Sequence, residues 1–594
     1  MPENGISPAP LATLQMNSSN KPFSGLVVER AAETRWWLAV STFVLVGLLA
    51  AGRYLGPFWL SDTSTGVSAE RVMNTLDMLL GEEQSIHTAG SRENELVRLR
   101  LLGALDNLGA QSWVLPLAKD ERLSPDDPRE RAIAVARASM ANIVARVPGA
   151  PRSRPLVLAT HYDACPQGPG AGDAGQCVSA ILEAIHVLQQ QGMRHEVWCL
   201  FTDGEELGLW GAKDLVQRDD LPWGDRIPLV INFDARGDRG AALLYETHID
   251  NLRAMRIAAP HLAHPRVTSS LMVNVYQRLP NGTDFTPFRK AGWSGWNFAV
   301  IDGAERYHTA EDTIENLSPR SAIHFAAHAV RLVRAVDSLT PDELDSIEDS
   351  EPGVFFDVLG MFVIVYASSW NRWHLALTFA LWCVAWFVAR RRLRGRYVAL
   401  AAGLIILALT LSAVVGWLIA LGLKLADVLP KRYVPYGDLI CLLYPISAGA
   451  MIMALGRSVS VRCNRVELTS ALVLLLCLIG LVASEKFPGG AYLLVIPAGI
   501  LSVLMMVDAA GGVSGWADRS WGTLASVGPA LLYAPTYVLL TQALGPRYGW
   551  LIASGAALML LPTLLAWSPT ELTKPPQQHG KTPTDTMGPA AIAQ

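Results

Sequence analysis

Apolar residues occur along the chain in runs of two lengths. The longer runs have about 20 residues, the length that a helix needs to cross the hydrocarbon core of a membrane. The first is residues 36–57, and seven more lie at 373–389, 397–423, 437–455, 467–484, 490–507, 523–544 and 549–567. We therefore expect a transmembrane anchor at 36–57 and an all-α, seven-span transmembrane bundle over 373–567. A cleaved signal peptide is the alternative for the first run, which begins far from Met1 and lacks a small-residue cleavage site.

The shorter apolar runs lie between the anchor and the bundle, in residues 70–340. Amphipathic helical patterns such as 174–191 alternate with runs that are typical of buried strands. The four clearest runs are 155–160, 196–201, 228–233 and 296–301. Alternation of strands and helices predicts an α/β domain with a mostly parallel central sheet flanked by helices.

Three further segments do not fit either pattern. Residues 1–35 and 568–594 are polar or rich in Pro, Ser and Ala, without apolar periodicity, and we interpret both as disordered tails. Residues 354–369 are apolar, but they are too few for a normal span and include Asp357. We expect them to form an interfacial or re-entrant segment.

Composition and charge narrow the function classes. The chain has 594 residues, 51% of them hydrophobic, and a net charge of −4. The apolar excess agrees with an integral membrane protein, and the lack of basic excess argues against nucleic acid as a partner. Seven cysteines in a chain of this length do not indicate a disulfide framework.

The arginines predict the orientation. Residues 390–396 carry five arginines and residues 456–465 carry three, and short basic loops stay in the cytoplasm. This places both termini inside and the α/β domain outside the cytoplasm, although the basic segment 424–432 counts against it. Arg, Ala and Leu are frequent, which suggests a GC-rich bacterial genome. We therefore expect a bacterial inner membrane with a periplasmic domain. The membrane of the endoplasmic reticulum or vacuole is the eukaryotic alternative.

Polar side chains follow each of the four predicted strands. In an open α/β sheet, ligands bind beyond the carboxyl ends of the strands, so these side chains should meet at one edge. They are His161, Asp163, Asp173, Glu205, Glu206, Asp234, Asp302 and His308. Histidines with carboxylates are ligands that suit zinc. One ion needs three or four ligands, whereas two ions that share a bridging carboxylate would use five.

The adjacent glutamates at 205–206 suggest a division of labour. Successive side chains point in different directions, so one glutamate can bind metal while the other handles the proton of an attacking water molecule. The second glutamate would act first as a general base and then as an acid toward the leaving amine.

Five ordered motifs resemble the di-zinc metallopeptidase family 28 of clan MH. They are HYD, GAGDAGQ, DGEELGLWGA, NFDARG and YHTAEDT, and the resemblance covers residues 75–335. It implies a zinc aminopeptidase-like fold and two Zn²⁺ ions per chain. The implied ligands are His161, Asp173 and Asp234 for one ion, and Asp173, Glu206 and His308 for the other. Glu205 would be the general base, Tyr307 would stabilise the oxyanion, and Asp163 would orient His161.

The resemblance also implies the activity. An anchor before the peptidase domain and a bundle after it are similar to the membrane relatives of the endoplasmic reticulum and vacuole. We expect an exopeptidase, specifically an aminopeptidase, that hydrolyses peptides outside the cytoplasm with metal-activated water.

A glutaminyl cyclase-like zinc enzyme and a receptor-like domain without activity are the alternatives. A transporter is disfavoured because the predicted spans contain few charges. Cys165 and Cys177 are either bridged or two free thiols.

Overall fold

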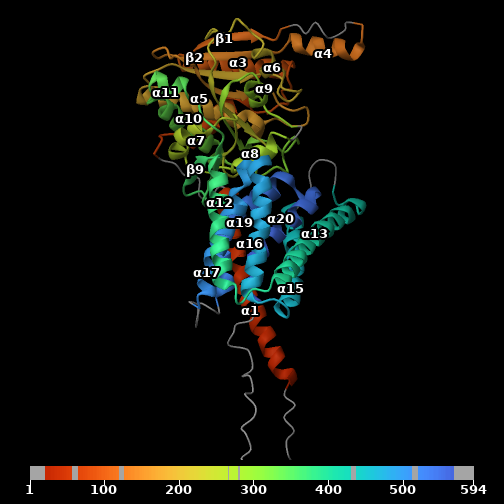
Figure 1. Ribbon diagram of the computed structural model, residues 1–594. Helices are drawn as coiled ribbons and strands as arrows, with labels where there is room; N and C mark the ends of the chain where they lie inside the picture. Colours follow the sequence, from red (N-terminus) through yellow and green to blue (C-terminus); the bar gives the residue numbers. More distant parts are fainter. Residues whose placement is uncertain are drawn as a thin grey trace, which may run out of the picture.

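A computed structural model describes residues 21–55, 64–118, 126–264, 266–278, 281–429, 437–511 and 520–567. An α/β domain lies at one end of a bundle of long helices (Figure 1). The chain enters the domain from the first long helix and returns to the bundle after the last strand pair. The expected tails at 1–20 and 568–594 lie outside the described residues.

Four parallel strands form the centre of the domain. In sheet order they are β4 (Val197–Thr202), β3 (Leu156–His161), β5 (Leu229–Ala235) and β7 (Ser294–Val300). All their residues are buried, as expected for strands with helices on both faces. The four predicted strands and the α/β class are therefore confirmed.

Three outer strands of the sheet were not among those predicted. β1 (Gln111–Pro116) and β2 (Ala141–Val147) extend the sheet beside β4, and β6 (Leu243–Thr247) lies beside β7. The full order is β1-β2-β4-β3-β5-β7-β6, with antiparallel pairing of β1 with β2, β2 with β4, and β6 with β7. The sheet is therefore parallel in its centre and antiparallel toward both edges.

Helices cover both faces of the sheet. One face packs on the core that includes α5 (Gln176–Gln191) and α10 (Pro319–Asp337), and α2 (Ala69–Leu80) contacts both helices. The other face packs on α6 (Trp210–Leu215) and α9 (Phe285–Lys290). The remaining helices of the domain are α3 (Arg92–Asn107), α4 (Pro128–Ala138), α7 (Leu252–Ala258), α8 (Ser270–Tyr276) and α11 (Pro341–Asp345).

Eight helices in the described residues are long and apolar enough to cross a membrane, and they coincide with the eight predicted spans. The helices that form them are α1 (Lys21–Tyr54), α12 (Trp370–Ala389), α13 (Gly395–Leu425), α14 (Gly437–Cys441) with α15 (Leu443–Ser460), α16 (Arg465–Lys486), α17 (Tyr492–Ala509), α19 (Trp521–Leu544) and α20 (Gly549–Leu560), which continues into the 3-10 turns Leu561–Ala566. Contacts between α1 and α19, α12 and α17, and α13 and α20 hold the bundle together.

The structure adds detail to two of the predicted segments. The N-terminal tail was expected to extend to residue 35, but α1 begins at Lys21. Residues 30–35, RAAETR, are mostly good helix formers, so the helix continues beyond its apolar part. Residues 354–369 mostly form an antiparallel hairpin of β8 (Gly353–Asp357) and β9 (Val363–Ala367). Its position at the membrane surface stays a prediction.

The domain and the bundle share hydrogen bonds. The amide of Ala241 donates to the carbonyl of Tyr54 at the end of α1, over 3.2 Å. The Tyr54 hydroxyl donates to the buried carboxylate of Asp357. Arg236, two residues after Asp234, donates from Nη1 to the carbonyl of Ala543 in α19, over 3.2 Å. The loop that follows β5 therefore lies against two helices of the bundle.

Candidate metal centre

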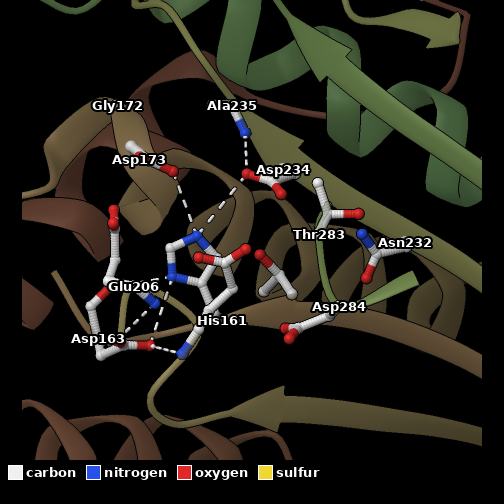
Figure 2. Close-up of polar contacts among 12 residues, drawn as sticks. His161, Asp163, Gly172, Asp173, Glu206, Asn232, Asp234, Ala235, Thr283 and Asp284 are labelled. Carbon is white, nitrogen blue, oxygen red and sulfur yellow. Dashed lines mark hydrogen bonds and ion pairs between the residues drawn. The ribbon is translucent and has the colours of Figure 1, made fainter. Parts of the chain in front are cut away.

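The carboxyl ends of the central strands bring the predicted polar residues to one place. His161 ends β3 and pairs in register with Thr202, which ends β4 and precedes the two glutamates. Asp234 lies at the same end of the neighbouring β5. Figure 2 shows the His161 ring directed toward the carboxylates of Asp173 and Asp234. The sheet register therefore explains why His161, Asp234 and the loop bearing the two glutamates meet here, whereas Asp173 comes from the turn Ala171–Gly175.

The first donor group consists of His161, Asp173 and Asp234. His161 Nε2 lies 3.2 Å from Asp173 Oδ1 and 3.7 Å from Asp234 Oδ1. One donor atom from each of the three buried residues lies within 4.8 Å of the other two. A nitrogen and two carboxylate oxygens at this spacing can ligate a single divalent cation.

The second donor group consists of Cys165, Glu206 and His308, whose donor atoms also lie within 4.8 Å of one another. His308 Nε2 lies 2.9 Å from Glu206 Oε1 and 3.2 Å from Asp173 Oδ2. The two oxygens of Asp173 thus face two different histidines, His161 and His308. Asp173 is placed between the two groups and can belong to both.

Orphaned polar atoms in the second group indicate that a cation fits. Glu206 Oε1 and His308 Nε2 are buried and make no hydrogen bond, although they are only 2.9 Å apart. Buried polar atoms normally have a partner, so each exception calls for an explanation such as an ion. A divalent ion between the nitrogen and the oxygen would satisfy both atoms. The donor set of nitrogen and carboxylate oxygen suits zinc.

Crowded carboxylates give the centre an excess of negative charge. Burial, reinforced by Asp173, raises the pKa of Glu206 to about 8, and burial raises the pKa of Asp234. Burial opposes the charge of His308, but the carboxylates of Asp173 and Glu206 raise its pKa to about 9. Burial also raises the pKa of Glu205 well above its ordinary value. Positive charge in the centre would stabilise these carboxylates in their ionised form.

Asp163 organises both glutamates as well as His161. The side chain of Asp163 is completely buried, and its carboxylate oxygens accept hydrogen bonds from the amides of Glu205 (3.1 Å) and Glu206 (3.2 Å). His161 Nδ1 lies 3.0 Å from the carbonyl oxygen of Asp163 and 3.6 Å from its carboxylate. The residue predicted to orient the histidine thus also fixes the backbone that carries the paired carboxylates.

Asp312 supports the centre and had no role assigned from the sequence. Its carboxylate accepts hydrogen bonds from the amides of Gly172 (2.6 Å) and Asp173 (3.2 Å). A Cβ atom at Gly172 would lie 2.7 Å from Asp312 Oδ1, so only glycine fits there without a shift. Asp312 belongs to the motif YHTAEDT, but this contact joins positions about 140 residues apart, which no local pattern reveals.

Other predicted residues lie near the centre with different contacts. The ring of Tyr307 stacks on that of His308, with centroids 3.7 Å apart, so its role toward an oxyanion stays a prediction. Asp302 instead forms an ion pair with Arg239, 3.4 Å from its Nε atom, and belongs to neither donor group. Cys165 and Cys177 are both free thiols.

Residues 142–333 match the family model of "Peptidase family M28". The chain carries an M28 peptidase domain. It is 31% identical over 255 residues to a vacuolar membrane protease of Eremothecium gossypii, covering 42% of this chain and 24% of that protein. It is 29% identical over 238 residues to human endoplasmic reticulum metallopeptidase 1, covering 39% and 26% of the two chains.

This chain therefore spans about a quarter of the length of these curated relatives. Among solved structures, a glutaminyl cyclase of Fimbriiglobus ruber aligns with 45% of this chain and 95% of its own, with 16% identity and a TM-score of 0.34. A likeness of this size carries no argument about activity. The M28 match covers the segment that bears all the residues of both donor groups.

Proposed function

We propose that this protein is a membrane-anchored di-zinc exopeptidase, an aminopeptidase, that hydrolyses peptides outside the cytoplasm. The observation that carries the proposal is the position of Asp173, whose two oxygens each lie 3.2 Å from a different histidine nitrogen. A carboxylate in this position can bridge two cations, which is the arrangement of two-metal hydrolytic sites. The M28 match and the names of the relatives, a protease and a metallopeptidase, support the reaction class.

The proposed ligands are the histidines and carboxylates of the two donor groups. One ion would be held by His161, Asp173 and Asp234, and the other by Asp173, Glu206 and His308. Bound zinc supplies Lewis acidity toward a peptide carbonyl and toward water. The chain itself holds the ligands in place through Asp163 and Asp312, which fix the backbone of two of them by hydrogen bonds.

Glu205 is the proposed general base. Its backbone amide donates to the carboxylate of Asp163, which also contacts His161 of the first donor group, and it is the direct neighbour of Glu206. Its carboxylate would take a proton from the attacking water and deliver it to the departing amine nitrogen. Tyr307, stacked on His308, is the proposed donor to the oxyanion of the tetrahedral intermediate.

The proposed orientation rests on the arginine-rich segments of the bundle. Asn464 donates from Nδ2 to the carbonyl of Arg392 over 2.8 Å, so the segments 390–396 and 456–465 meet. They lie at the end of the bundle opposite the α/β domain (Figure 1). By the positive-inside rule, this arrangement favours a domain outside the cytoplasm. A reporter that works only outside the cytoplasm should be active when fused near residue 340 and inactive at 395.

A peptide-library digest tests the reaction. Purified full-length protein is incubated with the library, with and without a chelator, and the products are read by mass spectrometry. We expect release of single N-terminal amino acids, lost with the chelator and restored by zinc. Formation of pyroglutamate would favour the cyclase alternative, and internal cleavage would overturn the exopeptidase assignment. A zinc-loaded protein that leaves every peptide intact would favour the receptor-like alternative.

A further inference from the structure

We propose that Cys165 is an additional ligand of the second cation, together with Glu206, His308 and the bridging Asp173. This inference rests on the proposed function, because it refines one of the two metal positions. Neither the carboxylate–histidine pattern of the sequence nor the resemblance assigns a thiol to the centre. The geometry instead places a thiol among the donor atoms of one position and not of the other.

The position of the Cys165 thiol is the first observation. Cys165 Sγ, a Glu206 carboxylate oxygen and a His308 ring nitrogen all lie within 4.8 Å of one another. The residue is 4% exposed, so the thiol faces the centre's interior rather than bulk water. Three donor atoms of three chemical types converge on one small volume, at a spacing that a single ion can bridge.

The orphaned atoms in the same group are the second observation. The Glu206 side chain is 5% exposed, and its Oε1 atom has no hydrogen-bond partner. The Nε2 atom of His308 also lacks one. Glu206 Oε1 and His308 Nε2 thus face each other over 2.9 Å without a hydrogen bond, and an ion between them could satisfy both atoms and bind the buried thiol as well. The thiol is therefore beside a position whose donor atoms fit a cation.

The local backbone explains why Cys165 faces His308. Its loop follows β3 and is held by the hydrogen bond from the amide of Ala164 to the carbonyl of His87, over 3.2 Å. Three residues after Cys165, Gly168 lies so close to the segment bearing His308 that a Cβ atom would be 2.2 Å from the carbonyl oxygen of Thr309. The two segments are thus packed backbone to backbone, which brings the thiol to the histidine.

A thiol ligand changes the character of the second position. Coordination deprotonates the thiol, which releases one proton to solvent and adds a negative charge and a soft donor. The second position would then have four protein ligands, as structural zinc sites do, whereas the first has three, as catalytic sites do. The two ions would therefore differ in role, with the second mainly holding the centre together.

Cobalt spectroscopy tests the assignment. The full-length protein in detergent is stripped of metal and reloaded with Co²⁺, because a thiolate bound to cobalt gives a charge-transfer band in the near ultraviolet. We expect the band in the wild type and its loss in Cys165→Ser. Cys177→Ser is the matched control, because Cys177 is a second buried free thiol whose environment includes Asp234, His161 and Asp173. This control should keep the band.

The zinc affinity of the second position gives an independent measurement. Substitution of groups that only support metal ligands already weakens binding by about 10–100-fold, so loss of a ligand should weaken zinc binding at least about tenfold in Cys165→Ser. Circular dichroism and thermal unfolding would establish that the variant is folded. Should the variant be unfolded, alkylation of Cys165 in the wild type gives the answer, because bound zinc should protect this thiol selectively.

The outcomes separate this inference from the proposed function. A wild-type protein that binds two Co²⁺ ions without a thiolate band would overturn the role of Cys165 and leave the two-metal proposal intact. The same holds if Cys165→Ser keeps the band or if Cys177→Ser loses it. A protein that binds neither Co²⁺ nor Zn²⁺ would overturn the proposed function itself.

Discussion

Buried charges in the α/β domain and in the bundle have different partners. In the domain, Asp173, Glu206 and Asp234 are crowded together with only two histidines to balance them. In the bundle, the buried carboxylate of Glu467 accepts from Arg394 Nε over 2.7 Å and takes part in a capping box at the start of α16. Within the described part of the bundle, no comparable group of metal-binding side chains occurs.

The difference separates buried charges with a structural role from those suited to bind a metal ion. A carboxylate that the chain itself neutralises and hydrogen-bonds is sufficiently explained by structure, as at Glu467. An excess of carboxylates that the chain leaves uncompensated is costly, because an unpaired buried charge loses its hydration. It is retained where an external cation completes it. Substitution of the crowded carboxylates in the domain should therefore change the metal content. Substitution of Glu467 in the bundle should change only the stability.

The largest expected effect is that of Asp173→Asn. This change removes the one carboxylate whose oxygens face both histidines, so both proposed ions should be lost. Metal catalysis contributes several kcal/mol of transition-state stabilisation, and we expect peptide hydrolysis to fall by at least about 10³-fold. Elemental analysis of the purified protein and an initial-rate assay provide the two measurements. Retention of two ions at full activity would refute the bridging role.

Glu467→Gln is the matched substitution in the bundle. Arg394 is about half exposed, but Glu467 is fully buried and accepts from both Arg394 and the amide of Asn464, so loss of one acceptor oxygen should cost about 1–3 kcal/mol of stability. Metal content and the rate per folded molecule should not change. A loss of zinc in this variant would show that buried charges in the two regions are coupled, contrary to the comparison.

The paired glutamates should differ from each other. Glu205→Gln preserves size but cannot accept a proton, so zinc should remain while the rate constant falls by about 10²–10⁴-fold. Glu206→Gln should weaken the second metal position, and its activity should partly recover in excess zinc. Rates and metal content of both purified variants provide the measurement. If Glu205→Gln lost zinc while Glu206→Gln kept both ions, the two roles would have to be exchanged.

Asp312→Asn should give a smaller effect, because Asp312 acts only through the backbone of Gly172 and Asp173. In the wild type each carboxylate oxygen accepts one amide hydrogen bond. Asparagine has only one acceptor oxygen, so one of the two bonds is lost. Loss of such a supporting contact typically weakens metal binding by about 10–100-fold. A competition titration with a zinc chelator measures the change. The maximal rate at saturating zinc should stay close to that of the wild type, which distinguishes support of a ligand from direct participation.

Two buried histidines in the domain are hydrogen-bonded to the backbone at both ring nitrogens. On α10, His324 Nδ1 accepts from the amide of Ala242 (3.0 Å), and His328 Nδ1 accepts from the amide of Ala263 (3.3 Å). The Nε2 atoms face the carbonyl oxygens of Ala263 and Ala242, respectively. Both rings must be neutral to accept and donate in this way. Burial lowers the pKa of His328 to about 3 and that of His324 well below its ordinary value.

The domain should therefore lose stability in acid. Between the ordinary histidine pKa of about 6.5 and the folded value of about 3 for His328, the unfolded chain binds more protons than the folded chain. This contribution is fully present above about pH 6.5 and decreases as the pH falls. Thermal unfolding at several pH values should show a smaller pH dependence for His328→Gln, which keeps a donor and an acceptor but does not titrate. An unchanged dependence would assign the acid loss to other groups.

The pattern of apolar residues predicted the centre of the sheet and not its edges. The runs at 155–160 and 228–233 are continuous because helices cover both faces of these strands. β2 contains Asn142 and Arg146, and β6 has an irregularity between Leu244 and Glu246, so neither strand has a clear apolar pattern. These outer strands depend on pairing with the strands beside them, which a local pattern does not contain.

The residues of the two donor groups could be singled out from the sequence because each follows a strand or lies in a motif. Their arrangement could not, because it depends on backbone contacts between distant segments. Asp163 was expected to act on His161 alone, whereas its carboxylate also holds the amides of Glu205 and Glu206. Asp312 was overlooked because its partners lie in another loop. Such contacts become visible only when the folded backbone is known.

The segment that matches the family model is shorter than the segment whose residues pack and hydrogen-bond together in the α/β domain. The M28 match ends at residue 333, yet Phe355 of β8 is fully buried in the main core of the domain. The amide of Ala241 and the guanidinium of Arg236 also have their acceptors on α1 and α19. A fragment limited to residues 142–333 would lack Phe355 from its core. It would also lack the acceptors of Ala241 and Arg236, which follow the proposed ligand Asp234. The α/β domain is thus completed by helices of the bundle.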